Sequence, residues 1–429
     1  MPDLLQRIPI PLLVVAGVVL AVAVLLVIIW SIRHRTDPDF TIENPPERFE
    51  LARQSITGLT HSGCASGNEV RLLENGDGFF PRLLADIDEA ELSVHFESYL
   101  WKPGELSDRL TKHLVDAAKR GVDVKVLLDW TGGKISTEQD ERLTSAGASV
   151  QRFRQLSLKN LGRMNSRDHR KIAVIDGCIG YVGGHCIVDT WLGDAEDREH
   201  FRDISVRVRG PVVNDIQAAF SENWIEATDT LFFGDAFFPR LEPAGDCDVH
   251  VARVNPSGVT SSVKLLHHVV IECARKSIRI QNPYFLPDPS AIDSLRRAVE
   301  RGVDVQVMIP SIDATDNALV QHASHHRFGA LMKHGIRIHE YDKTLLHQKV
   351  MCVDGVWAAV GSTNFDDRSF EINDEITLGI WSETLAAKLE EIFQKDLEHC
   401  TELTVEKWNS RGVLHKMKDQ MFFLINEQL

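Results

Sequence analysis

The sequence predicts an α/β protein that contains two copies of one structural unit and begins with a transmembrane helix. Three features predict this: a long apolar run near the N-terminus, motifs that recur at a nearly constant offset, and alternating strand-like and helix-like segments within each copy. The length of 429 residues fits two or three domains at roughly 100–200 residues each. With 43% hydrophobic and 25% charged residues, most of the chain is expected to form packed cores.

The N-terminal run from Ile8 to Ile32 spans 25 residues without a formal charge. A helix that crosses a bilayer needs about 20 apolar residues, whereas the apolar core of a secretory signal has about 7–15. We therefore predict a transmembrane helix over residues 8–32. Arg33, His34 and Arg35 follow it, and only Arg7 and the terminal amine precede it. The positive-inside rule then places the rest of the chain in the cytoplasm.

Internal repetition is the clearest feature of the remaining chain. RGVDVKV at residues 120–126 returns as RGVDVQV at 301–307, an offset of 181, and HRKIAVIDG at 169–177 returns as HQKVMCVDG at 347–355, an offset of 178. Matches in the same order indicate two copies of one unit, which packed together would form a pseudo-twofold molecule with a shared site on the axis. The predicted boundaries are a linker at 36–48, the first repeat at 49–235, an inter-repeat linker at 236–246, the second repeat at 247–405 and a tail at 406–429.

Each copy alternates strand-like and helix-like segments. A strand pattern is followed by a helical pattern and then by a continuous apolar run of the kind found in buried strands. Strands that alternate with helices indicate an α/β sheet in each copy. In order, these segments are 93–101, 106–120 and 122–129 in the first copy and 277–286, 289–301 and 303–310 in the second.

Composition excludes some functions and leaves others open. The formal net charge of −15 argues against general nucleic-acid binding, because phosphate contacts need clustered Lys and Arg. The seven cysteines show no C-x-x-C spacing, so free buried thiols are expected rather than a structural zinc site. The Phe-rich segment 231–239 could enter a membrane, but packing between the two copies is favoured, and the same holds for the tail at 422–425.

Each copy contains a His and a Lys two residues apart at the start of an apolar run: His169 with Lys171, and His347 with Lys349. Residues at i and i+2 of a strand face the same side. Pseudo-symmetry could bring two imidazoles and two ammonium groups to one point, which suits an anionic phosphate. The lysines would neutralise its oxygens, one imidazole would attack phosphorus, and the other would protonate the leaving oxygen. This chemistry requires neither a metal nor a cofactor.

Asp176 and Asp354 complete an H-x-K-x-x-x-x-D spacing and are counted with the catalytic candidates. Their parity differs from that of His and Lys, so in a regular strand they face the other way. Each is followed by Gly, and Asp-Gly between apolar runs is a strong signal for a type I′ hairpin. A role in shaping a turn is therefore favoured over direct chemistry.

Two acids could orient the histidines. Asp203 lies 34 residues after His169, and Glu375 lies 28 residues after His347, each at the start of an apolar segment. A carboxylate on the distal ring nitrogen would fix the tautomer and stabilise imidazolium. Asn364 lies in a short polar loop that could contact phosphate, whereas the matching position is Cys186.

Three histidines at His322, His325 and His326 fall at i, i+3 and i+4 of a predicted helix. No carboxylate or Cys pattern stands nearby in the sequence. A solvated face or a headgroup contact is therefore favoured over a metal site.

HRKIAVID…VGG and HQKVMCVD…VGSTNFDDRS resemble the paired signature of the phospholipase D superfamily. The stretch NPYFLPD at 282–288, the duplication and the N-terminal apolar run look like those of bacterial cardiolipin synthases. The resemblance covers nearly the whole chain beyond residue 50. It implies two tandem phospholipase D-type α/β sandwiches in a pseudo-twofold arrangement, in an enzyme of the bacterial inner membrane.

The resemblance also implies roles. A phosphatidyl group would move from one phosphatidylglycerol to another, glycerol would leave, and one motif histidine would carry the phosphatidyl group. The nucleophile carries over to His169 and the acid to His347. The phosphate and substrate contacts carry over to Lys171, Lys349, Asn364, Gly183, Gly184 and Ser362, and the histidine partners to Asp203 and Glu375. Cys186 departs from the family's Asn or Ser.

Four functions remain open in order of preference. The first is a phosphatidyltransferase that makes cardiolipin or a related phospholipid, and the second is a hydrolase with the same site and water as acceptor. The third is a nuclease, which the acidic balance and the membrane anchor oppose. The fourth is a silent membrane scaffold, which the loss of a motif His or Lys would support, and none is lost.

Overall fold

The computed structural model describes residues 10–31, 40–155, 165–254 and 261–423, and the chain divides into two compact units, residues 1–40 and 41–429. The first unit contains the helix α1 (Ile10–Ser31). In the described part of the chain, no helix meets the length and apolarity required to cross a membrane. The predicted transmembrane helix is therefore not confirmed. Its end residues 8, 9 and 32 and the linker residues 36–39 lie outside the described residues.

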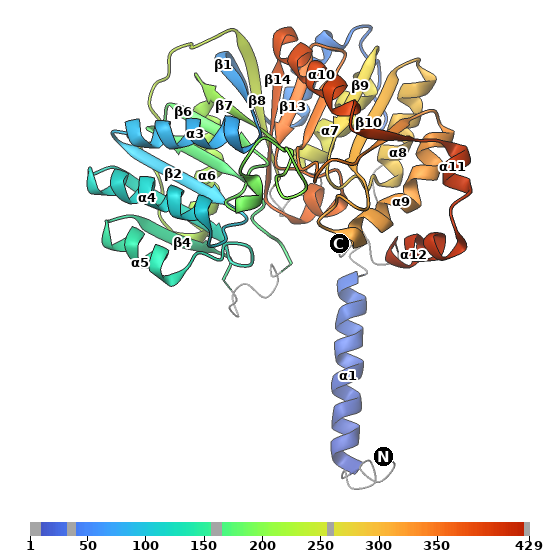
Figure 1. Ribbon diagram of the computed structural model, residues 1–429, viewed down its shortest axis with the longest axis horizontal. Helices are drawn as coiled ribbons and strands as arrows, with labels where there is room; N and C mark the ends of the chain where they lie inside the picture. The colour runs from blue at the N-terminus through green and yellow to red at the C-terminus, as the bar shows by residue number, and fades with distance from the viewer. Residues whose placement is uncertain (1–9, 32–39, 156–164, 255–260, 424–429) are drawn as a thin grey trace. The chain divides into compact units, whose positions relative to one another are not determined.

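The second unit is built on a mixed sheet that has fifteen strands in the described residues (Figure 1). Its strand order is β15-β11-β10-β9-β12-β13-β14-β8-β1-β7-β6-β5-β2-β3-β4. The strands are β1 (Cys64–Glu74), β2 (Ser93–Ser98), β3 (Asp123–Asp129), β4 (Ser149–Phe153), β5 (Ile172–Ile175), β6 (Ile179–Gly183), β7 (Ile204–Arg209), β8 (Cys247–Val254), β9 (Ser277–Gln281), β10 (Asp304–Pro310), β11 (Arg337–Tyr341), β12 (Val350–Val353), β13 (Trp357–Gly361), β14 (Glu375–Trp381) and β15 (Cys400–Leu403).

The strand order reads the same way outward from the central β8–β1 pair. One direction gives β14, β13, β12, β9, β10 and β11, and the other gives β7, β6, β5, β2, β3 and β4. β9, β10 and β11 run parallel to one another, as do β2, β3 and β4, whereas the inner strands pair antiparallel. β15 adds an antiparallel edge strand to β11 that has no counterpart beside β4. The continuous apolar runs predicted as buried strands are β3 and β10, which confirms the α/β interpretation.

Helices cover both faces of the sheet. Figure 1 shows α3, α4 and α5 along one half of it and α7, α8 and α9 along the other. In α4, Leu106, Leu110 and Leu114 recur every four residues and are buried, as expected for a helix with one apolar stripe. The helices are α2 (Arg53–Leu59), α3 (Asn75–Glu89), α4 (Glu105–Lys119), α5 (Thr137–Ser145), α6 (Val213–Thr228), α7 (Ser262–Cys273), α8 (Pro289–Glu300), α9 (Ala318–Lys333), α10 (Glu383–Leu397), α11 (Val405–Asn409) and α12 (Val413–Phe423).

Local sequence signals fix where the helices begin. At α8, the Asp288 side chain accepts a hydrogen bond from the Ala291 amide at 2.6 Å, and Pro289 occupies the first turn, where a missing N–H costs nothing. At α5, Ser136 and Gln139 form a reciprocal capping box. The helical patterns predicted at 106–120 and 289–301 thus become α4 and α8.

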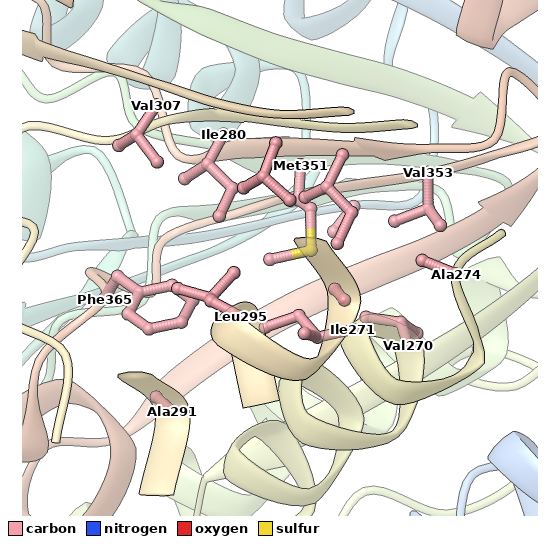
Figure 2. Close-up of a cluster of buried hydrophobic side chains, with 14 of the residues drawn as sticks. Val270, Ile271, Ala274, Ile280, Ala291, Leu295, Val307, Met351, Val353 and Phe365 are labelled. Atoms are coloured by element: carbon pink, nitrogen blue, oxygen red, sulfur yellow. The ribbon is translucent and has the colours of Figure 1, made fainter. Parts of the chain in front are cut away.

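The core of the second half lies between two helices and the sheet (Figure 2). Ile271 of α7 and Leu295 of α8 face Ile280 of β9 and Val307 of β10, and Met351 of β12 lies among them. All five side chains are at most 2% exposed. Full burial of such a side chain stabilises the fold by about 1.5–3 kcal/mol, so this cluster fixes the position of β12 and of the residues that precede it.

The Phe-rich segment at 231–239 packs against the protein. Phe232 and Phe237 stack with ring centroids 4.5 Å apart, and Phe238 contacts the same apolar cluster. Phe233 alone remains 92% exposed. The ring contacts of Phe232 and Phe237 are with His95, Phe220 and Trp224 of the first half, so packing between the two copies is not confirmed.

All seven cysteines lie within the described residues and are free thiols. The prediction that they are buried holds for four of them and is wrong for Cys64 and Cys178, which are exposed, while Cys400 is half-buried. Cys178 is exposed because it stands in the turn between β5 and β6.

The two halves of the sheet pack against each other where the two H-x-K motifs lie. β13 contacts β6 and β7, and β14 contacts β6. Two isolated parallel bridges join the halves directly, Asp168 with Asp374 and Arg202 with Leu346. These bridges hold the residues immediately before β5 and β12 at the boundary between the halves.

Candidate active site

The backbone of each motif histidine is held by the opposite half of the protein. The amide of His169 donates to the carbonyl of Asp374 at 3.0 Å, and the amide of His347 donates to the carbonyl of Arg202 at 2.7 Å. Each of these hydrogen bonds places the histidine beside the next residue in the sequence after its backbone partner. Those residues are Glu375 and Asp203, the two acids that the sequence suggested.

The histidine–acid pairs cross between the halves. Nδ1 of His169 is hydrogen-bonded to Oε1 of Glu375 at 2.8 Å, and Nδ1 of His347 is hydrogen-bonded to Oδ2 of Asp203 at 2.7 Å. Both acids are fully buried, whereas the imidazoles keep a small exposed area, which leaves each Nε2 as the nitrogen available for chemistry. Neither half contains a complete pair, so the structure assembles one composite site.

Both motif lysines are buried beside their histidines. Nζ of Lys171 donates to the carbonyl of His169 and Nζ of Lys349 donates to the carbonyl of His347, each at 2.6 Å. Nζ of Lys349 also lies 3.0 Å from Nε2 of His347. The positive charges of both lysines act on His169, so groups from the two halves converge on one point. Such a point suits a phosphate anion.

Burial and neighbouring charge make the two histidine–acid pairs electrically different. Burial, followed by the charges of Lys171 and Lys349, holds the pKa of His169 well below its usual range. Burial alone would raise the pKa of Asp203, but the charge and hydrogen bond of His347 outweigh it and keep that pKa below its ordinary value. Burial raises the pKa of Glu375 to about 8, despite the opposing charge of Lys171. His169 is therefore neutral, and Asp203 is ionised.

Positions 183, 184 and 362 carry small residues because they lie against the two acids and their strands. A Cβ added at Gly184 would lie 2.3 Å from Oδ1 of Asp203, and one added at Gly183 would lie 2.0 Å from Oγ of Ser205. Ser362 matches Gly184 in the second half, and its hydroxyl donates to Oε2 of Glu375. These three positions contact the acids and their strands.

Asn364 and Cys186 occupy matching buried positions. Oδ1 of Asn364 has no hydrogen-bond partner among the described residues. Asn282 of the NPYFLPD stretch supports this loop, because its side-chain oxygen accepts from the amide of Phe365 at 3.2 Å. Burial raises the pKa of the Cys186 thiol, which also feels the charge of Lys171.

Two aromatic side chains complete the site and carried no sequence signal. The ring of Tyr99 meets the edge of His169 at 5.0 Å, and Nζ of Lys171 lies 5.2 Å from the Tyr99 ring centre. Trp191 donates from Nε1 to Oδ2 of Asp203 at 2.8 Å, and its ring stands perpendicular to that of His347 at 5.0 Å. The one available hint was that Tyr99 directly follows the strand at 93–98, whereas Trp191 ends a short 3₁₀ helix, Asp189–Trp191.

Asp176 and Asp354 form turns at the far end of β5 and β12. Asp354 and the glycine after it have φ values of +56° and +71°, and the amide of Val356 donates to the carbonyl of Val353, as in a type I′ turn. The Asp354 carboxylate accepts from the amides of Arg275, Lys276 and Ser277. Asp176 repeats this pattern with three amides before β2. At about 3.3 Å per strand residue, either aspartate lies about 16 Å from its motif lysine.

We predict that Asp354→Ala lowers stability and leaves chemistry intact. Three partly buried amides lose their acceptor and alanine is strained at positive φ, so the free energy of unfolding should fall by about 2–4 kcal/mol. Denaturant unfolding and turnover per folded molecule measure the two effects. Asp354→Asn is the matched control, because asparagine tolerates positive φ and keeps one acceptor. Lost turnover with unchanged unfolding would instead place Asp354 in the chemistry.

The fold and the crossed site define a protein of the phospholipase D type, and the family comparison agrees. The description "Cardiolipin synthase, PLD-like domain" matches residues 83–224 and 269–397, and the chain belongs to this family. The major cardiolipin synthase ClsA of Bacillus subtilis is 34% identical over 370 residues, covering 85% of this chain and 76% of the relative. A cardiolipin synthase of Staphylococcus aureus strain Mu50 is 35% identical over 382 residues, covering 87% of this chain and 77% of the relative.

A solved structure supports the fold. The phosphatidylserine synthase of Haemophilus influenzae Rd KW20 superposes with a TM-score of 0.69 and covers 89% of this chain and 98% of its own. Its sequence identity of 14% means that the likeness concerns the fold alone. The family match and the two curated relatives confirm the resemblance indicated by the paired motifs.

Proposed function

We propose that this protein is a phosphatidyltransferase that makes cardiolipin from two phosphatidylglycerols and releases glycerol. The observation that carries the proposal is the crossed site, in which two histidines, two lysines and two acids from both halves converge. Membership of the family and the names of the curated relatives support the choice of lipid over nucleotide substrates. The net charge of −15 also opposes a nuclease.

In the first step, Nε2 of His169 attacks the phosphorus of one phosphatidylglycerol. A P–N bond forms, the P–O bond to the glycerol headgroup breaks, and the leaving oxygen takes a proton from His347. The ammonium groups of Lys171 and Lys349, together with the amide of Asn364, stabilise the charge on the phosphoryl oxygens. Glycerol leaves, and the phosphatidyl group remains on His169 as a phosphohistidine.

In the second step, a hydroxyl of the second phosphatidylglycerol attacks the same phosphorus. His347, now neutral, takes the hydroxyl proton as general base while the new P–O bond forms and the P–N bond breaks. Cardiolipin leaves, and both histidines return to their starting states. Water in place of the hydroxyl would give phosphatidic acid, which is the hydrolase alternative.

The electrostatic difference between the two pairs supports this order of roles. A nucleophile must be neutral, and His169 has the strongly lowered pKa. An acid needs its imidazolium stabilised. Burial and the charge of Lys349 lower the pKa of His347, and the charge and hydrogen bond of Asp203 oppose that lowering. The bound phosphodiester adds a second negative charge beside His347 and favours its protonation further.

We infer that the globular part arose from two copies of one unit, with repeats at 49–235 and 247–405. The motif offsets in the sequence and the strand order that reads alike from the β8–β1 pair support this. In this arrangement Gly184 corresponds to Ser362, and Cys186 to Asn364. The two halves therefore offer unequal phosphate contacts, which fits one site that binds two lipids in turn.

We also propose that the run from Ile8 to Ile32 anchors the enzyme in the bacterial inner membrane, with the catalytic part in the cytoplasm. Its length of 25 uncharged residues exceeds the roughly 20 that a bilayer requires, and Arg33 and Arg35 follow it. Alkaline carbonate extraction of cell membranes tests this. The protein should stay in the membrane pellet, and its release into the supernatant would overturn the anchor.

We expect activity to peak near pH 8. Burial raises the pKa of Glu375 to about 8 and lowers that of Lys349 to about 8. Below this pH the Glu375 carboxyl is protonated and no longer fixes the tautomer of His169. Above it the Lys349 ammonium loses its proton and with it the charge that stabilises phosphate. A pH profile of kcat/KM should therefore be bell-shaped. The kcat/KM profile of Lys349→Arg should not fall on the alkaline side, because the guanidinium stays charged.

The direct test is to incubate purified full-length protein in vesicles with phosphatidylglycerol labelled in the headgroup or in the acyl chains. Cardiolipin formation with one glycerol released per product, absent in His347→Ala, would support the proposal. Phosphatidic acid as the sole product would establish the hydrolase alternative. A folded protein that yields neither product would overturn both.

A further inference from the structure

Three histidines and one aspartate that take no part in the candidate active site meet between two helices. His322 and His325 lie on α9, and His415 and Asp419 lie on α12. One ligand atom from each of the four residues lies within 4.8 Å of all the others. The solvated face predicted for the α9 histidines is therefore wrong for His325, which is 3% exposed and faces α12. The sequence around the α9 histidines offers no carboxylate, but the fold supplies one from Asp419, 97 residues after His322.

The separations within this cluster match a tetrahedral ion. Oδ1 of Asp419 lies 2.8 Å from Nδ1 of His322, 3.5 Å from Nε2 of His415 and 3.9 Å from Nδ1 of His325. Nδ1 of His325 and Nε2 of His415 are 3.3 Å apart. Four ligands at about 2.0–2.2 Å from a tetrahedral Zn²⁺ lie about 3.3–3.6 Å from one another. The observed values scatter around that edge length.

Hydrogen bonding alone leaves this arrangement poorly satisfied. Three ring nitrogens point at one carboxylate oxygen, which has two lone pairs. Two of these nitrogens, on His325 and His415, also face each other, and at most one of them can donate to the other. A divalent ion among them would use one lone pair from each ligand.

The surroundings supply the outer contacts that metal ligands usually have. Nε2 of His325, the ring nitrogen that does not enter the cluster, lies 3.3 Å from Oε1 of Glu340, although without the geometry of a hydrogen bond. Nη1 of Arg411 donates to Oδ2 of Asp419 at 2.6 Å and leaves Oδ1 for the ion. Such outer partners fix the tautomer and orientation of metal ligands. Trp408 packs against His325 and closes one side of the cluster.

We propose that His322, His325, His415 and Asp419 bind one Zn²⁺ ion that ties α12 to α9. The spacings fit, since residues three or four apart on a helix share a face: His322 with His325, and His415 with Asp419. Four protein ligands fill the coordination sphere, which is the pattern of a structural zinc site rather than a catalytic one. The ion plays no part in phosphoryl transfer, and its role is to hold the C-terminal helix in place.

Metal content of the full-length protein, purified without a histidine tag, tests the site. The wild type should retain about one Zn²⁺ per chain after gel filtration, and Co²⁺ in its place should show the intense visible bands of tetrahedral coordination. Asp419→Asn and His415→Gln, which keep side-chain size, should lose most of the bound zinc. His326→Ala is the matched control, because His326 neighbours the site on α9 but stacks on Phe423 instead.

Thermal unfolding gives a readout that does not depend on turnover. A chelator should lower the unfolding midpoint of the wild type and leave that of His415→Gln unchanged, because the variant has no site to empty. A wild type that holds no zinc and gains no stability from it would overturn the proposal. So would zinc that survives His415→Gln and disappears with His200→Ala, since His200 belongs to an exposed group with Glu196 and Asp197.

Discussion

His169→Ala should lower the rate of phosphatidyl transfer by more than about 10⁴-fold, because in the proposed mechanism His169 supplies the atom that bonds to phosphorus. His347→Ala should lower it by about 10²–10⁴-fold or more, as expected for loss of a general acid and base. Both imidazoles belong to one composite site, so neither variant should keep half of the activity. Two half-active single variants would show that the halves work independently.

The two histidines can be told apart with a phosphodiester whose leaving group needs no proton. With an aryl ester of phosphatidic acid, His347→Ala should release about one equivalent of aryl alcohol and then stall with labelled phosphatidyl on the protein. His169→Ala should release none. The reverse pattern would exchange the roles. Asp354→Ala serves as the matched control, because Asp354 belongs to the same motif but lies in a distant turn.

Asp203→Asn and Glu375→Gln should both slow the reaction, but with different pH dependence. Asp203 stays ionised because the charge of His347 holds its pKa below the ordinary value, so Asp203→Asn should cost about 10²–10⁴-fold at every pH from 5 to 9. Glu375 has a pKa of about 8, so its carboxyl is protonated below that pH. Glutamine imitates the protonated form, and Glu375→Gln should therefore match the wild type near pH 6 and fall behind as the pH rises through 8.

The measurement is kcat/KM for both variants across this range, with ring-nitrogen NMR of His169 and His347 to follow the tautomers. Asp203→Asn should change the His347 signals and leave those of His169, and Glu375→Gln should do the opposite. This assignment is specific to crossed pairs. If Glu375→Gln changes the His347 signals instead, each histidine pairs with the acid of its own half, and the composite site is wrong.

Much of the fold was readable from the sequence because its signals are local. The apolar runs of β3 and β10, the caps of α5 and α8 and the Asp-Gly turns each depend on residues close in the chain. The H-x-K motifs were equally visible, and their position before β5 and β12 follows from the strand patterns.

The crossed pairs were not readable, because spacing within one copy does not say which histidine an acid will meet. Packing of β13 and β14 against β6 decides this, and the contact depends on side chains spread over the whole chain. The same reason hid Asp419, which reaches His322 from 97 residues further along the sequence. The transmembrane helix predicted at 8–32 is the element that the described residues do not confirm.

The crossing of the pairs also sets when a newly made molecule can act. The ribosome releases His169 with its lysine long before Glu375, which lies 206 residues further on. At about 5–20 residues per second, that gap lasts roughly 10–40 s. For the first 178 of those residues His347 is also still to be made. The order of synthesis therefore prevents either histidine–acid pair from being complete until the second half has been translated.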